Sequence, residues 1–300
     1  MGADRTMLGR LPRESRVALG VIASLAIVAT IGPMIVHWAP NEQLDIVKLA
    51  SQPPSLAHPL GTDRFSRDLL SRVLHGARLS LSVALLSVVL STSVGVLYGT
   101  VAGWNGGWID AALMRVLDAL LAIPRVLLLV AMLALWTPVP VGVLILLLGL
   151  TGWFGTSRLV RAEVMAARDR EYVLAARGLG ASASRLVFRH VWPNVLGPVI
   201  VSATLGVANV VVLEAGLAYL GVGAREPASS WGRIFRDGAD SFAHDWWVAF
   251  FPGIAIVITA LAFNVLGDGL RDALDPRNLV RSPAGTAPGA DITSQPVVDA

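Results

Sequence analysis

The 25 residues from Leu79 to Gly103 read LSLSVALLSVVLSTSVGVLYGTVAG and contain no charged side chain. An α-helix of roughly 20 apolar residues crosses a bilayer core, so this stretch predicts a transmembrane span. Small residues recur at every fourth position along it, at Ser87, Ser91, Gly95, Gly99 and Gly103. Small side chains at this spacing let a second helix approach closely in lipid. We therefore predict that this ridge packs against another helix.

Five other apolar stretches bring the predicted set to six spans. They are Val17–Val36, a segment that begins near Ile109, Val141–Phe154, Val195–Gly221 and Trp246–Gly267. The uncharged run from Val126 to Ser157 is too long for one span, and the segment WTPVP at 136–140 divides it between the third and fourth helices. No small-residue cleavage site follows Trp38, so we expect the first span to be a retained anchor and not a signal peptide.

The composition of the chain indicates that lipid is its main solvent. Of the 300 residues, 54% are hydrophobic and only 15% are charged, and the mean hydropathy is +0.64. The absence of cysteine excludes a disulfide framework, a thiolate zinc cluster and a cysteine nucleophile. We therefore predict an all-α polytopic membrane protein with six transmembrane helices.

The basic residues exclude further classes of function. Of the 24 basic residues 23 are arginine, and Lys48, the one lysine, has no glycine near it. The chain therefore lacks a P-loop, in which a lysine after a glycine-rich turn reaches the phosphates of ATP. The arginines lie between apolar runs, where membrane topology explains them, so the formal charge of +3 does not indicate nucleic-acid binding. The five histidines show no metal-ligand spacing and no catalytic constellation is visible, so we expect neither a metal site nor an enzyme.

The distribution of arginine and lysine predicts the orientation. With the N-terminus inside the cell, the inner segments hold 15 of these residues and the outer segments hold 8. Inner loops of membrane proteins carry the positive excess, so we expect both termini in the cytoplasm. The predicted organisation is a cytoplasmic N-terminus (1–16), a first helix (17–38), an external loop (39–78), a core of five helices (79–270) and a cytoplasmic tail (271–300), disordered after about residue 281.

The segment 158–194, between the fourth and fifth spans, is too polar for lipid but is patterned like structure. One helix face is predicted from the i, i+3, i+4, i+7 spacing of Tyr172, Ala175, Ala176 and Leu179. We expect Asp169 to cap this helix at its start, and Gly178 and Gly180 to end it. Small alanines flanked by arginines are typical of a surface that another protein approaches closely.

A second short helix is predicted directly after this one. Ser182 is its expected N-cap and Pro193 its expected end. One side of the helix carries Leu186, Val187, His190 and Val191, and the other side carries Arg185 and Arg189. The segment 158–194 is therefore expected to project two amphipathic helices into the cytoplasm.

This segment resembles the cytoplasmic loop of the membrane subunits of bacterial binding-protein-dependent ABC importers. That loop carries a Glu-Ala-Ala motif, three residues, a glycine, and later a leucine-proline pair. Here Ala175-Ala176 are followed by three residues and Gly180, and Pro193 stands at the expected distance. Glu171 lies further from the alanines than in the general motif, and Trp192 occupies the leucine position.

Other stretches resemble one branch of this family, the dipeptide and oligopeptide permeases. They are HPLGTD at 58–63, LAYLGVG at 217–223, SWG at 230–232 and NVLGDGLRDALDP at 264–276. The resemblance covers about residues 17–277 and implies the type I importer permease fold. It also implies a permease subunit that moves short peptides across the bacterial inner membrane.

The resemblance implies partners as well. A second, similar permease subunit shares the pathway, and an external binding protein delivers the cargo. Two separate ATPase subunits bind ATP and Mg²⁺, so the chain itself needs no cofactor. We assign the ATPase-coupling surface to Glu171, Tyr172, Ala175, Ala176, Gly180, Ser182, Arg185, Arg189 and Pro193. Nickel chelates or another small solute are alternative cargoes. An ion-coupled secondary transporter is an alternative class, although no internal repeat is visible.

Three charged residues within the predicted spans are candidates for the pathway. Charges at bilayer depth are costly, so they face a partner or a wet cavity. Asp118 and Arg125 stand about two helical turns apart and are expected to share a face. Arg125 either lines the pathway and attracts a carboxylate such as a peptide C-terminus, or pairs with a carboxylate of this subunit or its partner. Glu214 faces the same choice, and we favour a packing or pairing role.

Two external segments are long enough to contact a docked binding protein. The candidates within them are Asp63, Arg64, Trp231 and Arg233. The alternative is that these segments form a lid over the pair of permease subunits.

Overall fold

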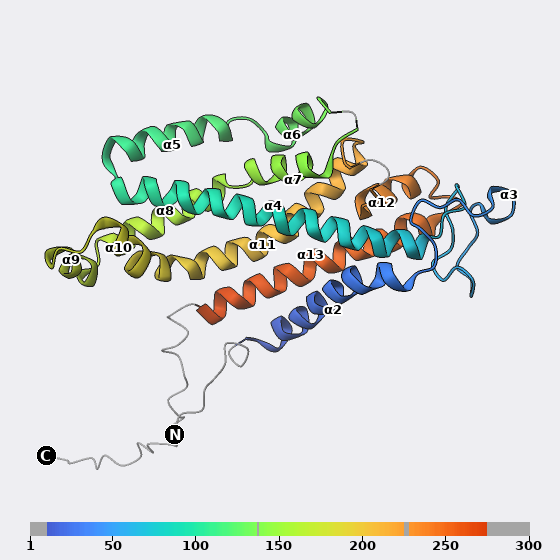
Figure 1. The fold of residues 1–300 in the computed structure, drawn as a ribbon, viewed down its shortest axis with the longest axis horizontal. Helices are drawn as coiled ribbons and strands as arrows, with labels where there is room; N and C mark the ends of the chain where they lie inside the picture. The colour runs from blue at the N-terminus through green and yellow to red at the C-terminus, as the bar shows by residue number, and fades with distance from the viewer. Residues whose placement is uncertain (1–10, 137, 225–227, 275–300) are drawn as a thin grey trace, which may run out of the picture.

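The computed structural model describes residues 11–136, 138–224 and 228–274, which form an elongated helical bundle (Figure 1). The long elements are α2 (Arg13–Ile35), α4 (Leu69–Asn105), α5 (Gly107–Leu121), α6 (Arg125–Leu133), α7 (Val141–Leu150), α8 (Phe154–Arg168), α11 (Trp192–Tyr219) and α13 (Trp246–Leu274). The short elements are α3 (Ile46–Leu49), α9 (Glu171–Gly178), α10 (Ala183–Leu186), the π-helix η1 (Val187–Val191) and α12 (Trp231–Ala239). The predicted tail beyond residue 274 lies outside the described residues.

The described helices provide up to six passes along the bundle. Four continuous helices are long and apolar enough to cross a membrane, and two bent pairs bring the number to six if each pair is one span. The pair α5 and α6 bends by 73°, and the pair α7 and α8 by 40°. The six predicted spans therefore each have a counterpart, but the third and fourth are broken helices.

Local chemistry explains the sharper of these bends. Pro124 lies between α5 and α6. Proline lacks an N–H group and disfavours helical geometry in the residue before it, so α5 stops and α6 starts again with Arg125. A single straight third span, in which Asp118 and Arg125 share one face, is therefore wrong.

The second span starts earlier than predicted. Helix α4 begins at Leu69, so residues 69–78 of the predicted external loop are helical. The carboxylate of Asp68 caps the helix by accepting a hydrogen bond from the backbone N–H of Ser71 at 2.8 Å. Arg72 is fully buried because it pairs with two carboxylates of the external end. Hydropathy misses this first part of α4 because the charged side chain of Arg72 is paired inside the protein.

The predicted ridge of small residues on α4 packs against other helices, and its three glycines lie against α8. A Cβ atom on Gly99 would lie 2.4 Å from the carbonyl oxygen of Ser157, and one on Gly103 would lie 2.7 Å from that of Arg161. A Cβ atom on Gly95 would lie 2.8 Å from the Cβ of Thr156. The two backbones therefore approach so closely that only glycine fits on α4.

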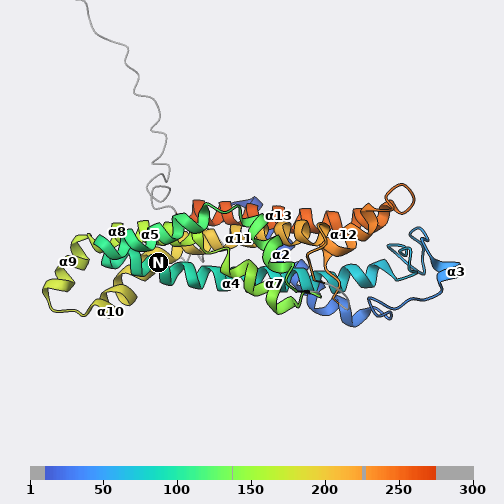
Figure 2. The same cartoon turned by 90° about the horizontal axis from the view of Figure 1, so that it is seen from above.

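The two ends of the bundle differ. Helices α9 and α10 lie at one end, while α3 and α12 lie toward the other, and the view at right angles in Figure 2 agrees. Helix α2 starts and α13 ends in the half that carries α9 and α10 (Figure 1). Helices α2 and α13 are in direct contact there, since the Ser15 hydroxyl donates a hydrogen bond to the carbonyl oxygen of Val265 at 3.2 Å. This arrangement agrees with an even number of passes.

Candidate functional site

A cavity of about 660 Å³ lies between α4, α6, α8, α11 and α13. Glycines and small aliphatic residues form much of its wall, and the polar side chains that line it are Ser91, Thr92, Arg125, Thr156, Glu163, Ser202, Asn209 and Arg271. Sites for small ligands usually measure about 300–1,000 Å³ and combine an apolar wall with a few polar groups. The cavity therefore has the size and chemistry of a passage or binding site for a small solute.

Arg125 lies at this cavity, at the start of α6. Its Nε donates to the hydroxyl of Thr151 at 3.2 Å, and its Nη2 donates to the carbonyl oxygen of Leu148 at 2.9 Å. Both acceptors lie at the C-terminal end of α7, where the carbonyl groups carry partial negative charge. Among the described residues no carboxylate forms an ion pair with Arg125. The predicted pairing with a carboxylate of this subunit is therefore not observed.

Asp118 takes a different partner. Its carboxylate accepts a hydrogen bond from Arg158 of α8, and both side chains are more than half exposed. Further along the same helix, Asp110 pairs with Arg161 of α8. Asp118 does not line the cavity. It links α5 to α8 through its ion pair with Arg158 and is not a pathway residue.

Glu214 is also absent from the cavity wall. It is 2% exposed, and the Ser80 hydroxyl donates to its Oε2 at 3.3 Å. The same hydroxyl accepts from the backbone N–H of Trp231 at 3.2 Å, and the side chain of Ser230 also hydrogen-bonds to Glu214. The carboxylate thus holds the start of α12 against α4, which is the packing and pairing role that we favoured.

The segment 158–194 has a buried side and an exposed side. Val173, Leu186, Val187 and Val191 are buried against the bundle. The residues that we assigned to coupling lie mostly on the outer side: Glu171, Tyr172, Ala175, Gly180, Ser182, Arg185, Arg189 and Pro193 are exposed, and Ala176 is half-buried. The segment therefore presents an uncovered surface at one end of the bundle, which we call the α9–α10 surface.

The structure corrects one predicted helix cap in this segment and confirms the other. Helix α9 follows Arg170 and has no side-chain cap, so Asp169 does not cap it. Ser182 does cap α10, because its hydroxyl accepts from the backbone N–H of Arg185 at 3.4 Å. Gly180 has a φ of +82°, in the left-handed region that favours glycine, and so permits the turn between the two helices.

Pro193 does not end the second helix. The chain continues from α10 through η1 into α11, and the N–H of Trp192 bonds to the carbonyl oxygen of Val187 across an i→i+5 turn. Because Pro193 stands in the first turn of α11, its missing N–H does not interrupt the helix. Residues Ala183–Tyr219 therefore form one helical run of 37 residues from the α9–α10 surface into the cavity wall.

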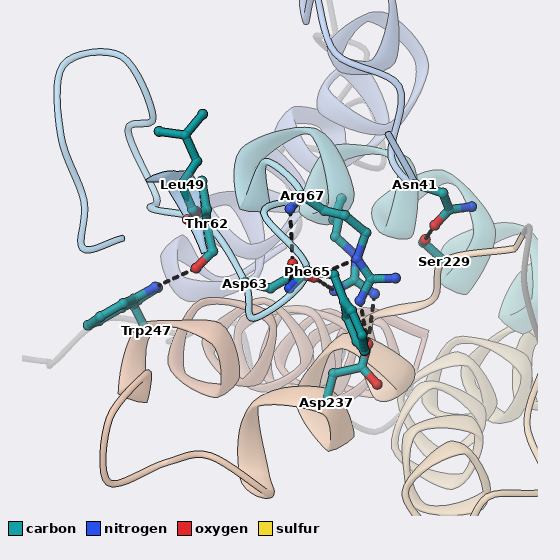
Figure 3. A network of polar contacts seen from close by, with 10 residues as sticks. Asn41, Leu49, Thr62, Asp63, Phe65, Arg67, Ser229, Asp237 and Trp247 are labelled. Atoms are coloured by element: carbon teal, nitrogen blue, oxygen red, sulfur yellow. Dashed lines mark hydrogen bonds and ion pairs between the residues drawn. The ribbon is translucent and has the colours of Figure 1, made fainter. Parts of the chain in front are cut away.

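The external end is tied together by buried ion pairs (Figure 3). Asp63 accepts from Arg67 Nε at 2.6 Å and from Arg72 Nη1 at 2.7 Å, and both arginines also reach Asp237 of α12, at 3.3 and 2.9 Å. Trp247 of α13 donates to the carbonyl oxygen of Thr62 at 3.1 Å. These contacts fix the external loop onto α12 and α13.

Two of the four residues proposed to contact a binding protein lie inside this end. Asp63 and Trp231 are each 1% exposed, and Trp231 Nε1 donates to the carbonyl oxygen of Val73 at 3.0 Å. Neither side chain is accessible to a docked protein, so their role is to hold the external end together. Arg64 is exposed and Arg233 is half-buried, and both border a second hollow of about 330 Å³.

Of the polar residues that line the cavity, the sequence assigned only Arg125 to the pathway. Asn209 lies in the middle of α11 and is exposed, and Glu163 and Arg271 line the cavity from α8 and α13. Asn209 could have been found from the sequence, because a single amide side chain within a mostly apolar span suggests a polar cavity or partner. Glu163 and Arg271 gave no such signal, because both lie in polar sequence at the ends of their helices.

Together, the six passes, the cavity and the uncovered α9–α10 surface define a membrane-spanning transport subunit. Among the described residues no group of three or more histidines, aspartates or glutamates is placed to hold a metal ion. Residues 95–280 match the family of binding-protein-dependent transport system inner membrane components, and the chain belongs to this family.

Relatives of known name cover most of the chain. A peptide transport system permease protein of Brucella suis is 42% identical over 88% of both chains. The oligopeptide transport system permease protein OppC of Bacillus subtilis is 38% identical over 91% of this chain and 89% of its own length. The dipeptide permease DppC of the same organism is 39% identical, over 86% of this chain and 80% of its own length.

A solved structure supports the fold assignment. A chain of the MetNI methionine ABC transporter, solved in an inward-facing conformation, superposes with a TM-score of 0.54. The superposition covers 68% of this chain and 96% of that one, at 19% sequence identity. The fold is that of the type I ABC importer permeases.

Proposed function

We propose that this chain is a permease subunit of an ATP-driven importer that moves short peptides across the bacterial inner membrane. Three relatives with 38–42% identity are named as peptide, oligopeptide and dipeptide permeases. The observation that carries the proposal is the continuous helix Ala183–Tyr219, which joins the uncovered α9–α10 surface to the wall of the cavity. This geometry lets an event outside the membrane change the shape of the passage.

The energy comes from separate subunits in this proposal. The chain has no P-loop lysine, so two partner ATPases bind ATP and Mg²⁺ and dock on the α9–α10 surface. When the ATPases close, they push on α9 and α10, and the continuous helical connection through η1 moves α11 beside the cavity. The chain needs no cofactor of its own for this role.

The remaining partners follow from the two other exposed regions. A second permease subunit completes the passage, because the cavity of this chain opens at the surface of the bundle. An external binding protein delivers cargo at the opposite end, where Arg64 and Arg233 are its proposed contacts. Both termini and the α9–α10 surface then lie in the cytoplasm, in agreement with the positive charge of the inner segments.

Ala176→Arg tests the docking surface. We expect co-purification of the ATPases with the permease to fall by about tenfold or more, because a long charged side chain prevents close approach of a partner. Gly180→Asp is a second variant, since φ at this position is +82°. Ala57→Arg is the matched control, because Ala57 is exposed at the external end. Recovery of the ATPases at the normal ratio with Ala176→Arg would contradict the assignment.

Cargo is tested by uptake in a strain that lacks this permease. We expect uptake of a labelled dipeptide to fall in the deletion strain and to return when the chain is supplied on a plasmid. Labelled nickel, offered with and without a chelator, is the comparison. If nickel uptake depends on the chain and dipeptide uptake does not, the peptide assignment is wrong while the importer class stands.

A further inference from the structure

Arg125 lies at the wall of a cavity, and no carboxylate among the described residues forms an ion pair with it. A guanidinium has five N–H donors. Thr151 and Leu148 accept two of them, so three remain for another acceptor. An ionised group at membrane depth without compensation costs about 2.5–3.5 kcal/mol or more. The three remaining donors therefore favour an anion in the cavity.

The surroundings of Arg125 leave room for such an anion. Gly152 lies beside the guanidinium, and a Cβ atom at this position would come within 3.1 Å of Arg125 Nη2 and of Ser91 Cβ. The glycine thus keeps open the space between the arginine and α4. Ser91, Thr92 and Asn209 line the same cavity and supply neutral hydrogen-bonding groups.

The two acceptors of Arg125 also fix its orientation. The acceptors at Thr151 and Leu148 hold Nε and Nη2 against the end of α7, and Arg125 itself begins a helix after the bend at Pro124. A planar guanidinium held in this way presents parallel N–H groups, the geometry that matches a carboxylate. A small inorganic anion would not use a cavity of about 660 Å³.

We propose that Arg125 binds the terminal carboxylate of the cargo during its passage. This inference rests on the proposed import of peptides and narrows it to peptides with a free C-terminus. Glu163 of α8 and Arg271 of α13 also line this cavity. The cavity wall therefore carries charges of both signs, as binding of a zwitterionic peptide requires.

The experiment compares trialanine with trialanine amide in proteoliposomes that contain the complete importer and its binding protein. For each permease variant, the ratio of the two initial uptake rates is measured. The same binding protein delivers both peptides to every variant, so a change in the ratio reports on the permease alone. With Arg125→Gln and Arg125→Met we expect the preference for the free acid to fall by about tenfold. Arg115→Gln, an exposed arginine of α5 outside the cavity, is the matched control and is expected to keep the ratio.

Each outcome separates the two proposals. If the wild-type importer takes up neither peptide, the proposed function is wrong. If it takes up the peptides and both neutral variants keep the normal ratio, the carboxylate site is wrong while the proposed function stands. If neither neutral variant assembles, the ratio is measured with Gly152→Ala instead. The added methyl group crowds the Arg125 guanidinium but leaves its charge in place. An unchanged uptake ratio with this variant overturns the proposal.

Discussion

At the scale of single residues, burial separates charges that hold the fold from charges that face the cavity. Asp63 and Arg72 are nearly or fully buried and satisfy one another, together with Arg67 and Asp237. Arg125, in contrast, is half-buried at a cavity and bonds only to neutral acceptors among the described residues. The partners of a charged residue in a span, and not its depth in the membrane, therefore indicate whether its role is structural or functional.

Asp63→Asn is expected to destabilise the external end. The change leaves Arg67 and Arg72 buried with half of their negative charge removed, and loss of one partner from a buried ion pair costs about 3–5 kcal/mol. The measurement is thermal unfolding of the detergent-solubilised protein. Asp240→Asn, an exposed acid of the same end, is the control and is expected to change little. An unchanged unfolding temperature for Asp63→Asn would show that the network contributes nothing to stability.

At the scale of elements, close helix packing and local bends build the cavity. The glycines of α4 bring its backbone against α8, and α8 in turn carries part of the cavity wall. The bends at Pro124 and at residues 151–153 turn α6 and α8 so that Arg125 meets the end of α7. The helical repeat alone would have placed Arg125 near Asp118, which instead pairs with Arg158.

Gly99→Ala tests the contact between α4 and α8. The added methyl group would lie 2.4 Å from the carbonyl oxygen of Ser157, so the helices must separate, and we expect a loss of about 1–3 kcal/mol in stability. Gly20→Ala is the matched control, because no heavy atom lies within 4 Å of the added Cβ there. Equal unfolding temperatures for the two variants would mean that the helices adjust at no cost.

At the scale of the whole molecule, the proposed mechanism depends on how the two exposed ends are connected to the cavity. The α9–α10 surface and the external loop lie at opposite ends of the bundle (Figure 1), and the cavity wall is connected to the first of them by one continuous helix. In the proposed function, a signal at the first end would therefore reach the passage along this helix, without contact between the partners at the two ends.

Labelling of single cysteines tests the orientation. The chain has no native cysteine, so Ala57→Cys and Ala183→Cys each introduce one thiol at an exposed position. In intact spheroplasts we expect a membrane-impermeant maleimide to label Ala57→Cys, and to label Ala183→Cys only after lysis. The reverse pattern would place the termini outside and would invalidate the docking assignment.

Hydropathy and spacing alone were enough to predict six passes, the glycine ridge of α4 and the two-sided segment at 158–194, because these features depend on neighbours along one helix. They failed for Asp63 and Trp231, whose burial depends on contacts with helices far away in the sequence. They also failed for Asp118, because the bend at Pro124 removes the helix face that it was expected to share with Arg125. Three-dimensional packing also assembled the cavity, since its wall combines residues from five helices. A periodic pattern indicates which face of a helix is apolar, but not which other helix packs against that face. The position of the cavity depends on that packing, so the sequence alone could not predict it.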